Sequence, residues 1–177
     1  MSISVEHKST AERCLQLIDK YSEDKTPFFR NCFDDGHFTS GVLVFNHDKT
    51  KVLLMKSKKF WTWQHFWGHA DGDMDLRSVA IKEFEEESWL SHDNLTLDHQ
   101  IGYIDIHRIP EMHHPKHGFE PEHYHYDCNF VWTVDENILL SSSDDDVDEM
   151  SWFKIEELEN ESWKFSSWVL AMFEHQL

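Results

Sequence analysis

Hydrophobic residues near the N-terminus recur at a spacing of three and four residues. They are Cys14, Leu17, Ile18 and Tyr21. This spacing is the period of an α-helix with one apolar face, so it predicts a helix over residues 10–21, within outer limits of about 8–22. A second stretch rich in aromatic residues predicts a C-terminal helix over residues 161–174.

Short aliphatic and β-branched runs predict the strands. Ser40–Asn46 and Lys51–Lys56 are separated by a polar turn of four residues and together predict a hairpin. Three further strands are predicted, at residues 101–107, 127–134 and 150–153. The serine- and aspartate-rich residues 141–146 predict an exposed loop. Because strands and helices mix without a regular β-α-β alternation, the pattern predicts a single α+β domain.

Composition narrows the classes of partner. Acidic side chains outnumber basic ones by 34 to 16, which gives a formal net charge of −18. Nucleic acids and membrane surfaces are polyanions that such a chain repels, so neither is expected as a partner. Three widely spaced cysteines without a CxxC pair favour a reducing, cytoplasmic location. The sequence also has no apolar run long enough to predict a signal peptide or a membrane span.

A glycine- and aspartate-rich turn, GHADGDMD, leads into a predicted helix that carries several carboxylates. Asp75 stands at the N-cap position of this helix. At roughly 100° per residue, Glu83, Glu86 and Glu87 project from one side, next to the apolar side that includes Phe84. Clustered carboxylates repel one another unless a cation is bound, and hard divalent ions prefer oxygen ligands. An acidic face exposed to solvent is the alternative interpretation.

Residues 68–90 resemble a Nudix box, which reads Gly, five residues, Glu, seven residues, then Arg-Glu-apolar-any-Glu-Glu-any-Gly-apolar. Gly68 matches the opening glycine and Leu90 the final apolar residue. The segments GHFTSGVLVF, GHADGD, IDIHRIP and PEHYHYDCNF are similar, in this order, to segments of a bacterial Nudix subgroup with a Gly-His-Ala-Asp-Gly loop. The resemblance implies one Nudix domain over residues 1–177, folded as an α/β/α sandwich with a mixed sheet.

Three positions depart from the box. Met74 stands in place of its first Glu, Lys82 in place of Arg, and Trp89 in place of the closing Gly. Lys82 is expected to pair with Asp73 or Asp75 instead. A bulky residue in the left-handed conformation costs about 1–2 kcal/mol, so the helix is predicted to avoid ending at Trp89 and to close near Asn94.

The resemblance implies a divalent-metal-dependent hydrolase that cleaves a diphosphate linkage in a nucleoside diphosphate derivative or a related organic pyrophosphate. Glu83, Glu86 and Glu87 match the metal-binding positions, and Mg²⁺ or Mn²⁺ is the expected cofactor. Glu86 or Glu87 is the expected catalytic base that activates water. The expected partner is a small-molecule diphosphate substrate. A homodimer is compatible with the resemblance, because Nudix domains often dimerise.

Basic and imidazole side chains outside the box are candidates for substrate binding. They are Lys56, Lys58, Arg108, His69, His123 and His125. His123 and His125 alternate along an extended segment, so they should face the same side. Imidazole suits Zn²⁺, Mn²⁺, Fe and Ni better than Mg²⁺, so a mixed site of histidine and carboxylate ligands is one interpretation. Histidines that only hydrogen-bond to loops are the other.

Two alternative functions stay open from the sequence. A non-catalytic, ligand-binding Nudix domain is favoured by the three departures from the box and opposed by its three intact carboxylates. An enzyme similar to isopentenyl diphosphate isomerase is the second, because that enzyme shares the fold and carries Cys-Gly-His at the matching loop. Here the loop reads Trp67-Gly68-His69, so the cysteine that would transfer a proton is missing.

Overall fold

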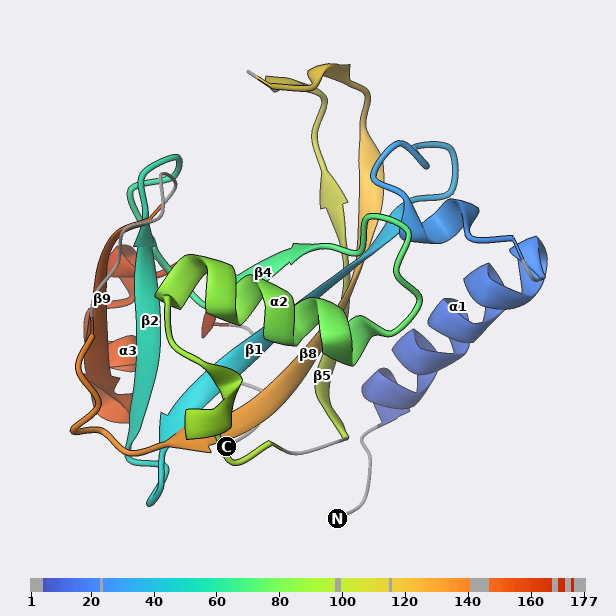
Figure 1. Ribbon diagram of the computed structural model, residues 1–177. Helices are drawn as coiled ribbons and strands as arrows, with labels where there is room; N and C mark the ends of the chain where they lie inside the picture. The colour runs from blue at the N-terminus through green and yellow to red at the C-terminus, as the bar shows by residue number, and fades with distance from the viewer. Residues whose placement is uncertain are drawn as a thin grey trace.

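A mixed β-sheet with helices on both faces forms the centre of the protein (Figure 1). The computed structural model describes residues 5–22, 24–97, 100–114, 116–140, 147–166, 169, 170 and 173. The seven strands of this sheet are β1 (His37–Asn46), β2 (Lys51–Ser57), β3 (Trp63–Gln64), β4 (Phe66–His69), β5 (Ile101–Ile109), β8 (His123–Val134) and β9 (Val147–Lys154). Their order is β3-β2-β1-β8-β5, with β4 paired to β1 and β9 paired to β2.

The central strands β1 and β8 run parallel, and every other pair of neighbours in the sheet is antiparallel. β1 pairs with β2 near its C-terminal end and with β4 near its N-terminal end. Both β2 and β4 therefore lie along the same edge of β1. A short hairpin of β6 (Met112–His114) and β7 (Gly118–Glu120) extends beyond the sheet from the ends of β5 and β8 (Figure 1). The mixed sheet confirms the predicted α+β sandwich.

In the described part of the chain, three continuous α-helices cover the sheet. They are α1 (Val5–Tyr21), α2 (Leu76–Ser88) and α3 (Ile155–Asn160), and 3₁₀ turns span Thr26–Phe28, His92–Asn94 and Ser162–Lys164. α2 crosses one face of the sheet, and α1 packs on the same face near β5. α3 and the segment around Phe165 cover the opposite face.

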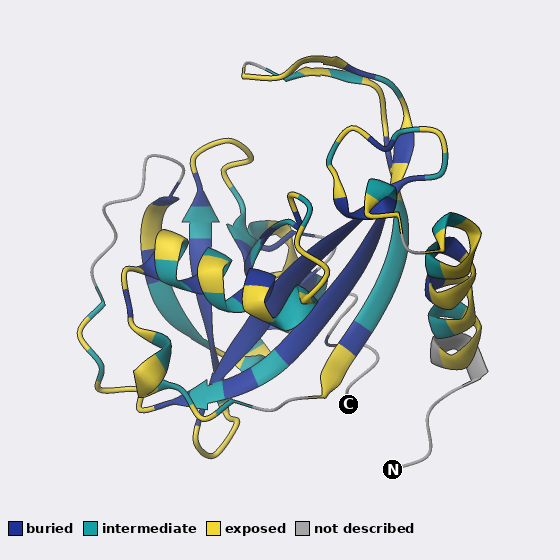
Figure 2. Ribbon diagram, turned by 45° about the vertical axis from the view of Figure 1, so that its right-hand side comes forward, coloured by how far each residue is buried: buried dark blue, intermediate teal, exposed yellow. Residues whose placement is uncertain are grey.

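Alternation along the two central strands decides what each face contains. On β1, Val42 and Val44 pack toward α2, whereas Leu43 and Phe45 pack toward Leu158 of α3. β1 is buried along its whole length (Figure 2). Because successive side chains of a strand point to opposite faces, even-numbered residues of β1 and β8 face α2 and odd-numbered residues face away from it.

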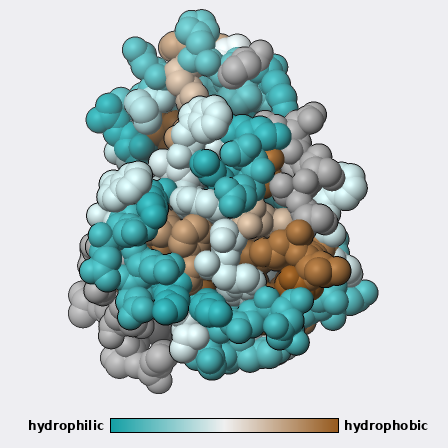
Figure 3. Space-filling model, turned by 90° about the vertical axis from the view of Figure 1, so that its left-hand side faces the viewer, coloured by the Kyte–Doolittle hydropathy of each residue, from teal (hydrophilic) through white to brown (hydrophobic). Residues whose placement is uncertain are grey.

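One side of the molecule is mostly hydrophilic. On the side of the molecule where β9 lies, hydrophilic side chains surround a smaller apolar area (Figure 3). Among the described residues, no helix combines the length and apolar character needed to cross a bilayer.

The predicted elements are mostly present, with different limits. The N-terminal helix, the β1–β2 hairpin and the three later strands all form, and each of these strands extends beyond its predicted range. The short strands β3, β4, β6 and β7 and the helix α3 were not predicted.

In the predicted helix 161–174, Ser162–Lys164 is a 3₁₀ turn and Phe165 instead forms an isolated bridge with Trp63. Val169, Leu170 and Phe173 are helical, whereas residues 167, 168, 171, 172 and 174 lie outside the described part. The predicted loop 141–146 also lies outside the described residues.

The predicted exit of α2 is wrong. The helix ends at Trp89, which adopts the left-handed conformation with φ 58° and ψ 21°, and its backbone N–H donates to the carbonyl of Glu85. The left-handed residue reverses the chain so that Leu90 is buried in the core, and this burial offsets the backbone strain. The residues near Asn94 form a separate 3₁₀ turn.

Glycine at this position should stabilise the protein. Trp89 has 64% of its surface exposed, so its ring contributes little packing. We expect Trp89→Gly to raise the free energy of unfolding by about 1 kcal/mol, because glycine adopts this conformation without the steric cost. Urea denaturation measures the change. Trp89→Ala is the matched control, because it removes the ring but keeps the Cβ atom. A less stable glycine variant would contradict the prediction.

Candidate metal and substrate site

The carboxylate helix begins as the sequence predicts. The side chain of Asp75 accepts hydrogen bonds from the backbone N–H groups of Arg77 at 3.1 Å and Ser78 at 3.3 Å, so it caps α2. The apolar side of α2 is anchored by Phe84, whose fully buried ring packs edge-on against Phe66 at 5.1 Å. This packing fixes the rotation of the helix, and the side with Glu83 and Glu87 therefore lies along β4.

Glu83 is largely enclosed, with 14% of its side chain exposed. It lies directly against Gly68 of β4, where an added Cβ atom would come within 2.6 Å of the carboxyl carbon and both oxygens. Burial raises the pKa of Glu83, the ammonium of Lys82 lowers it, and the negative charge of Glu86 raises it further. The glycine therefore makes room for a carboxylate that has lost much of its hydration.

Lys82 does not pair as expected. Its ammonium lies 3.4 Å from Glu83 Oε1 and 3.7 Å from Glu86 Oε2. The predicted pairing with Asp73 or Asp75 is wrong, because Lys82 lies seven residues after the N-cap, about 10 Å along the helix axis. Lys82 instead supplies a positive charge between two carboxylates of the box.

Glu87 is connected to the same strand. Its Oε2 accepts a hydrogen bond from the backbone N–H of Trp67 at 3.1 Å, so the side chain reaches from α2 to β4. Glu86 is more open, with 56% of its side chain exposed. Glu83, Glu86 and Glu87 thus form an oxygen-rich edge of α2, and two of them, Glu83 and Glu87, reach β4.

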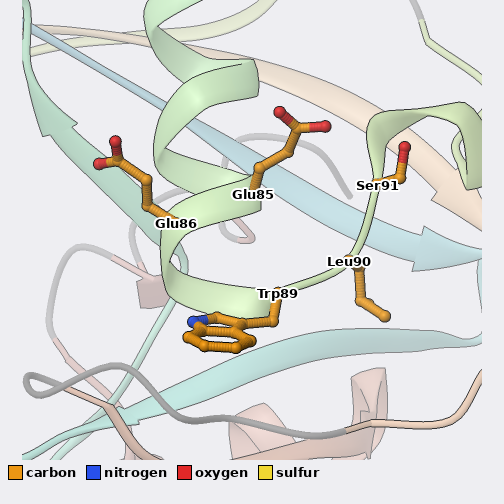
Figure 4. A pocket seen from close by; sticks show the side chains of 5 residues that line it. All are labelled: Glu85, Glu86, Trp89, Leu90 and Ser91. Carbon is orange, nitrogen blue, oxygen red and sulfur yellow. The ribbon is translucent and has the colours of Figure 1, made fainter.

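Glu85 has a different role. Its carboxylate accepts hydrogen bonds from the backbone N–H of His92 at 3.0 Å and contacts His92 Nδ1 at 2.7 Å, so it holds the turn that follows the helix. Figure 4 shows Glu85 and Glu86 pointing to opposite sides of α2, above a shallow hollow that Trp89 also lines. Of the four glutamates, Glu85 is therefore separate from the metal-binding candidates.

A group of histidines gathers on the face of the sheet opposite α2. His37 on β1, His69 on β4, and His123 and His125 on β8 form this histidine cluster. The ring centre of His37 lies 4.7 Å from that of His125, 4.9 Å from that of His123 and 5.2 Å from that of His69. His123 and His125 do face the same side, with their Nε2 atoms 3.3 Å apart.

Burial keeps most of this cluster neutral. Loss of hydration lowers the pKa of His37 to about 4 and that of His69 to about 2, and it lowers the pKa of His125 strongly. Neighbouring histidines in the cluster lower these pKa values further. At neutral pH these imidazoles therefore offer lone pairs and N–H groups rather than positive charge.

A buried polar group lies next to the histidine cluster on the same face. Asp127 accepts hydrogen bonds from Thr39 Oγ1 at 2.9 Å and from the Asn129 amide at 2.8 Å. His65 Nε2 lies 4.0 Å from Asp127 Oδ2. Burial lowers the pKa of His65, and the charge of Asp127 opposes that change.

The basic candidates are placed differently. Lys56 lies 3.6 Å from Asp148, on the face of β2 turned away from α2. Arg108 forms an ion pair with Glu122 and, because it follows His107 along β5, faces away from the histidine cluster. Lys58 lies in the exposed turn after β2. The structure thus brings His69, His123 and His125 together and leaves Lys56 and Arg108 outside this group.

Sequence reasoning did not assign a role to some residues that shape these sites. His37 belongs to a segment of the Nudix resemblance but receives no role from the sequence, although it lies at the centre of the histidine cluster. The backbone N–H of Trp67 and the absent side chain of Gly68 were also missed. Only the folded structure, which pairs β1 with β8 and packs α2 against β4, reveals these contributions.

Comparison with known proteins decides the family. A family model described as NUDIX domain matches residues 36–172, which is most of the chain. The chain belongs to the Nudix family. No curated protein matches it.

Solved structures share the fold. An E. coli dihydroneopterin triphosphate pyrophosphohydrolase matches with a TM-score of 0.60 and 16% identity, over 78% of this chain and 93% of that chain. A C. elegans Ap4A hydrolase in a binary complex matches at 0.55 and 13%, over 77% and 92%. A NUDIX-family hydrolase from Clostridium perfringens matches at 0.55 and 23%, over 78% and 94%. These likenesses confirm the Nudix fold, and membership of the family supports the prediction of a pyrophosphohydrolase.

Proposed function

We propose that this Nudix protein is a divalent-metal-dependent hydrolase of a diphosphate linkage in a nucleoside diphosphate derivative or a related organic pyrophosphate. The observation that carries the proposal is that Glu83 and Glu87 reach from α2 to β4, while Glu83 and Glu86 both lie beside Lys82. Hard divalent cations prefer such oxygen ligands, so the site suits Mg²⁺ or Mn²⁺. The intact carboxylates favour this function over a non-catalytic domain.

The donor set fits a cation because its carboxylates are crowded. Glu83 and Glu86 share the ammonium of Lys82, and burial raises the pKa of Glu83. Glu83, Glu86 and Glu87 would hold the metal. A bound divalent ion would neutralise the diphosphate and lower the pKa of a coordinated water.

The other groups of the site would have separate roles. The Trp67 N–H fixes the direction of Glu87, and Gly68 leaves room for Glu83. Glu86 or Glu87 would accept the proton of the attacking water, and the exposed Glu86 carboxylate is open to solvent. His69, which lies beside Trp67 and is neutral at pH 7, would contact substrate by hydrogen bonds rather than by charge.

Other features belong to the same proposal. We assign the chain to the bacterial subgroup with the Gly-His-Ala-Asp-Gly loop, with residues 1–177 as a single Nudix domain in the cytoplasm. Its partner is a small-molecule diphosphate rather than a nucleic acid or a membrane. Lys56, Lys58 and Arg108 stay candidates for substrate phosphates, although the ion pairs of Lys56 and Arg108 would have to open. A homodimer is compatible with this function.

A substrate panel tests the proposal. Sugar nucleotides, dinucleoside polyphosphates, nucleoside triphosphates and isoprenoid diphosphates are each incubated with Mg²⁺, with Mn²⁺ or with EDTA. We expect phosphate or nucleotide release from at least one class with metal and its loss with EDTA. Metal binding without any turnover would favour the ligand-binding alternative. An isomerised isoprenoid diphosphate would favour the isomerase alternative, which Trp67 opposes by occupying the position of the cysteine.

A further inference from the structure

The histidine cluster contains a preformed set of nitrogen ligands on the face of the sheet opposite the carboxylates. His37, His123 and His125 are each buried, and one nitrogen from each lies within 4.8 Å of the others. The three side chains come from β1 and β8: His37 pairs directly with His125, and His123, two residues before it on β8, pairs with Ile109 of β5. Their positions are therefore set by strands of the sheet rather than by a loop.

Hydrogen bonds decide which nitrogens carry lone pairs. His123 Nδ1 lies 2.7 Å from the carbonyl oxygen of Pro121, and His37 Nδ1 lies 3.4 Å from that of Cys32. A carbonyl oxygen only accepts, so in both residues Nδ1 carries the proton and Nε2 keeps its lone pair. A backbone carbonyl that orients the imidazole in this way is a common partner of metal-binding histidines.

One pair of nitrogens already lies at the spacing that a metal requires. His123 Nε2 and His125 Nε2 lie 3.3 Å apart. Two nitrogens bound to one tetrahedral Zn²⁺ at about 2.0–2.1 Å would lie about 3.3–3.4 Å from each other. His37 Nε2 is buried and has no hydrogen-bond partner among the described residues. A plain hydrogen bond between His123 and His125 would leave that nitrogen unsatisfied, whereas a shared cation would satisfy it.

The geometry points to a zinc site formed by the Nε2 atoms of His37, His123 and His125. An all-imidazole donor set suits Zn²⁺ and disfavours Mg²⁺, so this site selects a different metal from the carboxylates of α2. His69 is partly exposed, and its ring centre lies 5.2 Å from that of His37 and 5.3 Å from that of His125. It therefore lies beside the site, on the side that reaches solvent.

Metal titration of the full chain tests the site. The protein is stripped with a chelator, dialysed and titrated with Zn²⁺ by calorimetry in excess Mg²⁺, which occupies the carboxylates. We expect one high-affinity zinc ion per chain. His123→Asn should weaken zinc binding by more than about 100-fold, since even the loss of a residue that only supports a ligand costs about 10- to 100-fold. The asparagine amide can still donate to the Pro121 carbonyl, so the variant preserves the local hydrogen bond.

Matched variants separate this site from the carboxylates. His113→Asn, at an exposed position of the β6–β7 hairpin, and Glu87→Gln should both bind zinc as the unmodified chain does. Loss of zinc binding in Glu87→Gln with retention in His123→Asn would overturn the assignment. Because zinc binding is measured without substrate, its failure is independent of any failure of the proposed hydrolase.

A second measurement needs no variant. Co²⁺ replaces Zn²⁺ in tetrahedral sites and then gives intense visible bands, whereas octahedral Co²⁺ bound to carboxylates absorbs weakly. We expect intense bands that saturate at one equivalent of Co²⁺ and disappear when Zn²⁺ is added. Weak octahedral absorption alone, or no binding of Co²⁺, would overturn the proposal even if His123→Asn failed to fold.

Discussion

Replacing Glu87 with glutamine should lower turnover of the diphosphate substrate by about 10²- to 10⁴-fold, the range that loss of a catalytic carboxylate commonly produces. The variant removes one negative charge from the oxygen-rich edge of α2 and weakens its hold on a divalent cation. The amide oxygen of glutamine can still accept the hydrogen bond from the Trp67 N–H, so the side chain should keep its position. Steady-state kinetics at saturating Mg²⁺ or Mn²⁺ measures the effect.

Glu85→Gln is the matched control for this prediction. It makes the same chemical change two residues earlier on the same helix, but Glu85 binds His92 and does not join the other carboxylates. We expect the control to retain turnover and both variants to keep a free energy of unfolding within about 0.5 kcal/mol of the unmodified chain. Full activity in Glu87→Gln, or equal losses in the two variants, would contradict the role assigned to Glu87.

The fold was predictable where local pattern and tertiary structure agree. α1 has an amphipathic spacing, and β1 and β2 have aliphatic runs. In each element the apolar residues that give this pattern are the residues that the core buries, so these elements are present as predicted. The two-residue strand β3 and the four-residue strand β4 carry too few residues to show a period. They form because β1 and β2 supply hydrogen-bonding partners, which sequence spacing alone does not indicate.

The exit of α2 shows how tertiary packing overrides a local preference. Propensity predicted that a tryptophan would avoid the left-handed conformation, yet Trp89 adopts it. The strain is accepted because the reversal at Trp89 lets Leu90 enter the core and lets Glu85 hold the next turn. The left-handed conformation of a bulky residue costs about 1–2 kcal/mol. Burial of a leucine contributes a similar or larger amount of free energy, so it outweighs that cost.

The two candidate sites also differ in how far the sequence predicts them. The carboxylates were predictable because helical periodicity places Glu83, Glu86 and Glu87 on one side of a single element. The histidine cluster joins three strands that are distant in the sequence, so only the side shared by His123 and His125 could be foreseen. The central position of His37 depends on its register opposite His125, which only the folded sheet defines.

Gly68→Ala should lower turnover by about 10²-fold, because a displacement of about 1 Å in a catalytic group can have an effect of that size. The new methyl group would lie within 2.6 Å of the Glu83 carboxyl carbon and both oxygens, so the carboxylate must move away. Gly68 matches the opening glycine of the Nudix box, and it lies directly against Glu83, one of the metal-binding candidates. The loss should appear as weaker metal activation as well as lower kcat.

Stability should change little in the same variant, since the atoms that must move belong to the end of a flexible side chain rather than to backbone. A double-mutant cycle with Glu83→Gln tests whether the effect passes through this carboxylate. If it does, adding Gly68→Ala to Glu83→Gln should cause almost no further loss of turnover. Full additivity of the two losses, or a fall in the free energy of unfolding that accounts for the lost activity, would show instead that Gly68 acts on the strand. The separation of activity from stability is therefore the decisive result, because it connects the empty space at one glycine to the position of one carboxylate.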